Sequence, residues 1–193
     1  MKNAEHLLDQ WKNVKGMQNL QNGNSAGVPD ARWLKPDPGW LKCNIDAAVF
    51  TQAGYSAFGW VLRDEAGEVI AAKNGVLSNL VDPLLAEAMS CRKALSWLKN
   101  LNLNKLIVES DALRVINAIQ DAYDDCSYFG AIIDDCKVLA KDLESCVFKF
   151  VRRSANRVAH TLARVTGFES DRREWFYNHP QFISYVLDSD GYE

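Results

Sequence analysis

The sequence lacks a paired-cysteine pattern, a long apolar run and an excess of positive charge. Its five cysteines are scattered without a Cys-x-x-Cys spacing, which argues against a disulfide framework or a zinc site and favours reduced core residues. No apolar stretch approaches the roughly 20 residues of a membrane helix, and no signal peptide is recognisable. We therefore expect a soluble, intracellular protein of the cytoplasm or nucleus that has no membrane partner.

The charge balance limits the kind of nucleic-acid contact that is possible. The formal net charge is -3 at pH 7, which argues against strong non-specific attraction to nucleic acid by bulk charge alone, so any contact must be local. The 193 residues are 48% hydrophobic and 24% charged, which suits one globular domain with short extensions. No internal repeat is present.

Composition divides the chain into three parts. Residues 1–30 combine an amphipathic helix over 4–20 with a linker rich in Asn, Gly and Ser. Residues 31–167 contain the alternating apolar patterns of a folded domain. Residues 168–193 form an aromatic tail that we expect to pack back on that domain.

The central part predicts three strands, a helix, a strand, two helices, a strand and a helix. Asp82-Pro83 predicts a helix start, with Asp as N-cap and Pro at the first helical position. The polar, Gly-containing segment 63–68 predicts a hairpin loop between the second and third strands. The expected fold is an α/β domain with a mixed sheet flanked by helices. The expected elements are strands 41–50, 56–63, 69–77, 105–109 and 146–151, and helices 82–100, 111–122, 129–143 and 155–165.

Three carboxylates occupy positions where acids are unusual. Asp46 lies inside a strand, Glu87 falls within the apolar stripe of a helix, and Asp111 follows a buried strand at its carboxyl end. Each has an ordinary alternative. Asp46 could face solvent, Glu87 could pair with Arg92 or Lys93 on its own helix, and Asp111 could cap the next helix.

Together the three acids point to a cation site. An all-carboxylate set suits a hard divalent cation such as Mg²⁺ or Mn²⁺. Two such ions about 4 Å apart are what phosphodiester hydrolysis uses to hold the attacking and leaving oxygens. We therefore expect two Mg²⁺ or Mn²⁺ ions, because crowded carboxylates would repel one another without them.

Four motifs in order resemble the ribonuclease H family, and most closely the reverse-transcriptase-like ribonuclease H domains of plants. They are Asn-Ile-Asp-Ala-Ala at 44–48, Leu-Leu-Ala-Glu-Ala at 84–88, Val-Glu-Ser-Asp-Ala at 108–112, and the segment 153–163. The resemblance implies a ribonuclease H-like five-stranded sheet of order 3-2-1-4-5. It also implies that Asp46 bridges two Mg²⁺ ions, and that Glu87 and Asp111 hold the ion next to the leaving group.

The fourth motif departs from the family at one position. The family commonly has an aspartate on the last helix, near the metal that activates the attacking water, whereas this sequence has His160. Neutral imidazole can ligate Mn²⁺ or Mg²⁺, although these ions prefer oxygen. We assign His160 as a substituted fourth metal ligand and catalytic residue; the alternative is a polar residue on a non-core helix face.

A local basic patch precedes and enters the last helix. Arg152, Arg153, Asn156 and Arg157 are the candidate nucleic-acid contacts, flanked by Lys149 and Arg164 with no acid between them. A solvated helix face is the alternative. Residues 121–144 are instead rich in Asp, where some ribonucleases H carry a basic protrusion, so we expect weak, salt-sensitive binding.

These patterns favour a metal-dependent endonuclease that hydrolyses the RNA strand of an RNA–DNA hybrid, with Asp46, Glu87, Asp111 and His160 as its catalytic metal ligands. We expect a monomer with nucleic acid as its partner. The alternative is a catalytically attenuated, retroelement-derived module that binds nucleic acid or protein. A third hypothesis, an interaction scaffold, assigns the acids no chemical role.

Overall fold

The computed structural model describes residues 32–191 except 78, 102, 122–124 and 167–172. The helix and linker predicted within residues 1–30 lie outside the described residues. Within the described ranges, none of the helices combines the length and the apolar character that crossing a bilayer requires.

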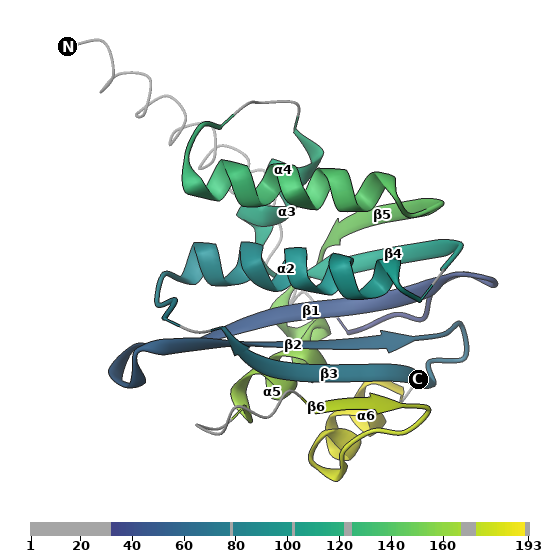
Figure 1. The fold of residues 1–193 in the computed structure, drawn as a ribbon. Coiled ribbons are helices and arrows are strands. Elements are labelled where there is room, and N and C mark those ends of the chain that lie inside the picture. The colour runs from purple at the N-terminus through teal and green to yellow at the C-terminus, as the bar shows by residue number, and fades with distance from the viewer. Residues whose placement is uncertain (1–31, 78, 102, 122–124, 167–172, 192–193) are drawn as a thin grey trace, which may run out of the picture. The chain divides into compact units, whose positions relative to one another are not determined.

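Six strands of the described chain form one mixed sheet of order β5-β4-β1-β2-β3-β6 (Figure 1). The first three strands are antiparallel neighbours, whereas β4 pairs parallel with both β1 and β5. This confirms the predicted order 3-2-1-4-5. A short sixth strand, which was not predicted, adds to the free edge of β3. The strands are β1 (Leu41–Phe50), β2 (Tyr55–Arg63), β3 (Val69–Leu77), β4 (Lys105–Ser110), β5 (Ser145–Phe150) and β6 (Arg173–Phe176).

Helices cover both faces of the sheet. Buried residues of α2, α3 and α4 join the apolar side of β1, β2 and β4 in the larger core, and α5 and α6 pack with β2 and β3 in a smaller one. Figure 1 shows α2 and α4 on the near side of the sheet and α5 and α6 behind it. The helices are α2 (Pro83–Lys99), α3 (Leu113–Gln120), α4 (Tyr128–Lys141), α5 (Arg157–Arg164) and α6 (Ser184–Gly191).

Local sequence signals explain where two of these helices begin. Asp82 is the N-cap of α2, its side chain accepts the Leu85 N–H at 2.8 Å, and Pro83 occupies the first turn. This confirms the predicted start. Ser127 caps α4 in the same way by accepting the Gly130 N–H.

The cysteines are free thiols, and one of them departs from prediction. Cys43, Cys91 and Cys136 are buried and Cys146 is partly buried, but Cys126 is exposed. The expectation of core residues is therefore wrong for Cys126. It lies just ahead of α4 in an acidic loop, where no apolar pattern marks a core position.

The two faces of β1 differ in polarity. Alternate residues Cys43, Ile45 and Ala47 enter the larger core, and the residues between them point to the α5 side because strand side chains alternate. Those residues, Lys42, Asn44 and Asp46, are at most 5% exposed. A strand buried on both faces therefore carries a row of polar groups, which need partners.

A buried polar network supplies partners for two residues of that row, Lys42 and Asn44. Glu109 of β4 accepts from Lys42 at 2.8 Å and from the Asn44 amide at 3.0 Å. Arg63 of β2 donates to the Asn44 oxygen at 3.0 Å and to Asp190 of α6 at 2.9 Å. The network ties the C-terminal helix to the central strands and leaves Asp46 for a different set of contacts.

A glycine opposite Asp46 brings α5 close to the sheet. Gly59 of β2 pairs with Asp46, and a Cβ built on Gly59 would lie 2.3 Å from the Ala163 nitrogen and 2.6 Å from the Ala159 oxygen. No side chain fits there because both neighbouring atoms belong to the backbone of α5. This close approach sets the height of α5, and hence of His160, above β1.

We expect Gly59→Ala to destabilise the fold by about 2–3 kcal/mol or more, because overpacking against backbone forces α5 away from the sheet. The matched control is Gly54→Ala, where φ is +73° and nothing lies within 4 Å of the added Cβ, so that only the backbone cost of about 1–2 kcal/mol applies. Urea unfolding measures both variants. Equal losses in the two variants would contradict the close-packing explanation.

Candidate metal centre

The site lies where β4 stops beside β1. The parallel pairing ends with Ser110 opposite Ile45, so β1 continues past this point without a neighbour on that side. Asp46 is the next residue of β1, and Asp111 directly follows the last residue of β4. The opening therefore places the carboxyl end of β4 beside the middle of β1, as the position of Asp111 predicted.

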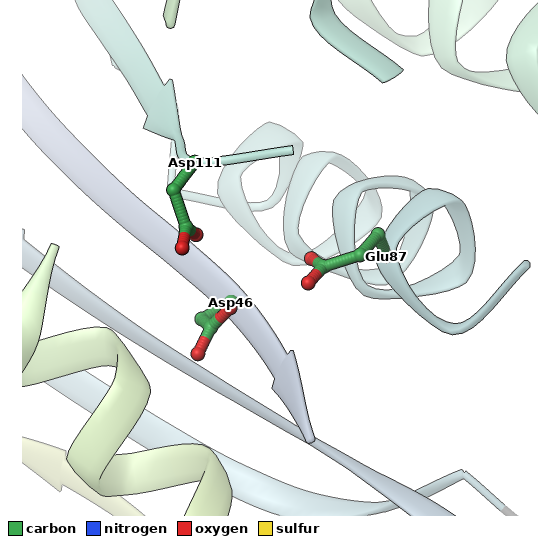
Figure 2. A group of neighbouring side chains, drawn as sticks. All are labelled: Asp46, Glu87 and Asp111. Carbon is green, nitrogen blue, oxygen red and sulfur yellow. The ribbon is translucent and has the colours of Figure 1, made fainter. Parts of the chain in front are cut away.

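Three carboxylates converge in this opening. One oxygen from each of Asp46, Glu87 and Asp111 lies within 4.8 Å of the others. Figure 2 shows the three side chains directed toward one another from β1, from α2 and from the end of β4. The convergence inferred from the sequence is thus present, although the three residues come from separate elements.

Asp46 is the buried member of this cluster. Its side chain is fully buried, and its Oδ2 lies 2.7 Å from Nδ1 of His160. Its Oδ1 is buried without a hydrogen-bond partner among the described residues. Burial raises the pKa of Asp46, partly offset by the His160 hydrogen bond. One carboxylate oxygen therefore lacks the compensation that a buried charge requires.

Glu87 reaches the cluster from α2. Ser90, one turn further along this helix, donates to the backbone oxygen of Asp46 at 2.9 Å, which fixes α2 against β1. Burial raises the pKa of the Glu87 carboxyl to about 9, and the charges of Asp46 and Asp111 add to the effect. The alternative partner Arg92 instead pairs with Asp135 of α4.

Asp111 is held by two donors from the segment ahead of α5. The Asn156 amide donates to its Oδ1 at 2.9 Å, and Arg153 Nε donates to its Oδ2 at 3.0 Å. The alternative role as a helix cap is wrong, because the N-cap of α3 is Ala112. Asp111 is therefore available to the cluster rather than committed to a helix end.

His160 touches the cluster through Asp46 alone. It lies on α5, its side chain is 26% exposed, and its Nδ1 contact to Asp46 is the one described above. Within the part of the chain that the structure describes, the group of convergent ligand atoms comprises Asp46, Glu87 and Asp111 without His160. The structure thus brings His160 to Asp46 and not to the other two acids.

The predicted nucleic-acid contacts divide into two kinds. Arg152, Arg153 and Arg157 are exposed, and Arg157 also donates to Ser189 of α6 at 3.0 Å. Asn156 is only 1% exposed, and its amide also donates to the Ile45 carbonyl at 2.9 Å. A side chain buried in this way holds Asp111 and β1, and its predicted role as a nucleic-acid contact stays a prediction.

The donor set fits a hard divalent cation. All three converging groups offer carboxylate oxygens, which Mg²⁺ and Mn²⁺ prefer. The unpartnered Oδ1 of Asp46 and the raised pKa of Glu87 both show a site that is short of positive charge. Asp46, Glu87 and Asp111 are the residues that would hold such an ion.

Sequence reasoning missed the groups that support these acids. Ser90 and the bond from Arg153 to Asp111 were not anticipated. Asn156 was named only as a candidate nucleic-acid contact, and its bond to Asp111 was not anticipated either. No pattern in the sequence identified Asp111 as its acceptor, 45 residues away.

The chain belongs to the reverse transcriptase-like family, whose model matches residues 44–166. The matched segment contains the three acids, Asn156 and His160. No curated protein sequence matches significantly.

Solved ribonucleases H share the fold at low sequence identity. Ribonuclease H1 from the halophilic archaeon Halobacterium salinarum NRC-1 is 20% identical, with a TM-score of 0.59 over 65% of this chain and 95% of that one. The N-terminal ribonuclease H domain of Rv2228c from Mycobacterium tuberculosis is 16% identical, with a TM-score of 0.58 over 65% and 91%. LC11 ribonuclease H1, isolated from compost and solved with an RNA/DNA hybrid, is 16% identical, with a TM-score of 0.58 over 65% of this chain and 95% of that one. The ribonuclease H-like fold is thereby established.

The pKa of Glu87 predicts a pH dependence of stability in the absence of divalent cations. A carboxyl whose pKa is raised on folding keeps its proton in the native state, so stability falls as pH rises from about 4.5 toward about 9. Glu87→Gln removes this loss. In EDTA its melting temperature should exceed the wild-type value by several degrees at pH 9, at about 2–4 °C per kcal/mol, and by much less at pH 5.

The matched control for this comparison is Glu65→Gln, at an exposed loop position. Its melting curve should follow that of the wild type at every pH. Parallel pH profiles for wild type and Glu87→Gln would show that Glu87 carries no buried titration.

Proposed function

We propose that the protein is a metal-dependent endonuclease that hydrolyses the RNA strand of RNA–DNA hybrids, using Mg²⁺ or Mn²⁺. The observation that carries the proposal is the convergence of three carboxylates, whose ligand atoms lie within 4.8 Å of one another. One of them, Asp46, also has a buried oxygen without a hydrogen-bond partner among the described residues. Family membership and the shared ribonuclease H-like fold support it. The hybrid bound in the LC11 ribonuclease H1 structure suggests the substrate class.

In this proposal Asp46, Glu87 and Asp111 hold the cations, and His160 takes the fourth position. Divalent ions held there would supply a charge that orients a water and stabilises the charge developing on the phosphate. The protein supplies rigid placement, because β1, α2 and the end of β4 are fixed to one another by Ser90 and Asn156. No covalent enzyme adduct is needed.

The substrate would approach over the exposed arginines at the start of α5. Arg152, Arg153 and Arg157 are suited to phosphate contacts, which position a nucleic acid without reading its sequence. Because the remainder of the chain is acidic overall, we propose weak and salt-sensitive binding.

Activity on a labelled RNA–DNA hybrid in Mg²⁺ or Mn²⁺ tests the proposal. We expect Asp46→Asn to lower the cleavage rate by about 10²-fold or more, because it removes the charge of the central ligand at a preorganised electrostatic site. Asp37→Asn, at an exposed position, is the matched control and should cleave like the wild type. Equal cleavage by wild type and Asp46→Asn would identify a contaminant and refute the assignment.

One observation favours a second function, that of a binding module with reduced catalysis. His160 Nδ1 lies 2.7 Å from Asp46 Oδ2, so the imidazole already engages one of the two Asp46 oxygens that would otherwise be open to a divalent cation. Such a module would bind the hybrid and release it uncut. Hybrid binding by the wild type without cleavage would support this alternative.

His160→Asp distinguishes the two functions. Restoring a carboxylate adds a negative charge and a preferred oxygen ligand, so we expect the cleavage rate to rise about tenfold or more, with tighter Mn²⁺ binding by calorimetry. His160→Asn, which changes the side chain without adding charge, should not reproduce the gain. If His160→Asp is no faster than the wild type, the histidine does not limit catalysis.

A further inference from the structure

The two donors that hold Asp111 differ in a way that matters for cation binding. Asn156 is neutral and 1% exposed, and it also holds the Ile45 carbonyl, so it is part of the fixed frame. Arg153 is charged and its side chain is 66% exposed, with its Nε 3.0 Å from Asp111 Oδ2. The same carboxylate is thus held by one rigid amide and by one cation that solvent can reach.

Arg153 already compensates the acidic cluster. Its charge lowers the pKa of both Asp46 and Glu87, although burial outweighs it at each, and Asp111 raises the pKa of Arg153 itself. A divalent ion held by Asp111 would lie next to this guanidinium, and two cations on one carboxylate repel each other. The guanidinium and a divalent ion therefore compete for Asp111.

The surroundings of Arg153 give its side chain another partner. It begins the short 3₁₀ turn Arg153–Ala155 after β5, next to the exposed Arg152 and one turn before Arg157. The backbone at this point is fixed, because the Val151 N–H donates to the Ser110 carbonyl at 3.0 Å. Only the side chain has to turn to exchange a carboxylate for a phosphate, the other anion that guanidinium binds in bidentate geometry.

We propose that Arg153 is a positioning residue that holds Asp111 until a nucleic-acid phosphate draws it away, so that phosphate binding and divalent-cation binding reinforce each other. This inference rests on the proposed function, since it assumes that Asp111 is a cation ligand. It assigns Arg153 a role that the neighbouring arginines, which lack this contact, do not share. The coupling is reciprocal, as linkage requires.

Mn²⁺ titration tests the proposal, with free Mn²⁺ followed by electron paramagnetic resonance. The wild type, Arg153→Gln and Lys105→Gln are each titrated with Mn²⁺ alone and with a saturating short DNA duplex, which offers phosphates but no ribose to cleave. Without duplex, we expect Arg153→Gln to bind Mn²⁺ roughly fivefold tighter than the wild type, the upper range for losing an exposed ion pair. Lys105→Gln, which removes an equal charge from an exposed position at the opposite end of β4, should change Mn²⁺ affinity much less.

The duplex adds a second readout. It should tighten Mn²⁺ binding in the wild type and in Lys105→Gln, and should have little effect in Arg153→Gln. If Arg153→Gln binds Mn²⁺ no tighter than the wild type while melting at the same temperature, Arg153 does not compete with the cation for Asp111. The inference about Arg153 then fails, and the proposed function does not. If the wild type shows no Mn²⁺ binding that Asp46→Asn abolishes, the proposed function and this inference fail together.

Discussion

A carboxylate buried in the middle of a sheet determines how this part of the molecule is built. Asp46 is fully buried on β1, and one of its oxygens has no hydrogen-bond partner among the described residues. A carboxylate in that position is unfavourable unless its charge is compensated. The contacts around it accordingly bring charge and hydrogen-bonding groups together from β1, α2, the end of β4 and α5.

The compensation depends on an interruption in the sheet. Had β4 continued beside β1, its backbone would have occupied the space where the carboxylates meet. The Ile45 carbonyl, at the last paired position, accepts from Asn156, which also holds Asp111. The same residue therefore satisfies the end of the ladder and orients a member of the site. On the opposite side of β1, Gly59 allows α5 to approach closely enough for His160 to reach Asp46.

The sequence allowed the cluster of acids to be predicted because each signal was local. Glu87 stood out against the helical apolar pattern, Asp46 against a strand, and Asp111 at a strand end. Strand β6 was missed because it has four half-exposed or exposed residues and pairs only with the edge strand β3. Its composition does not distinguish it from a loop.

Contacts between distant residues were beyond local reasoning. Arg63 and Asp190 form a buried ion pair although they are 127 residues apart in the sequence. The local sequence around either residue does not identify the other as its partner. The bond from Arg153 to Asp111 spans 42 residues, and Arg153 looked like any other member of a basic run. Cys126 was predicted to be buried because free cysteines generally are, but it is exposed. Its burial depends on what packs over that position, which the local sequence does not show.

The central claim is that the buried Asp46 carboxylate is compensated by a divalent cation shared with Glu87 and Asp111. Anomalous diffraction from a crystal soaked in Mn²⁺ measures this directly. The account predicts an anomalous peak in contact with Asp46 and with at least one of the other two carboxylates. A well-ordered site without such a peak, in which Asp46 keeps only its contact to His160, would contradict it.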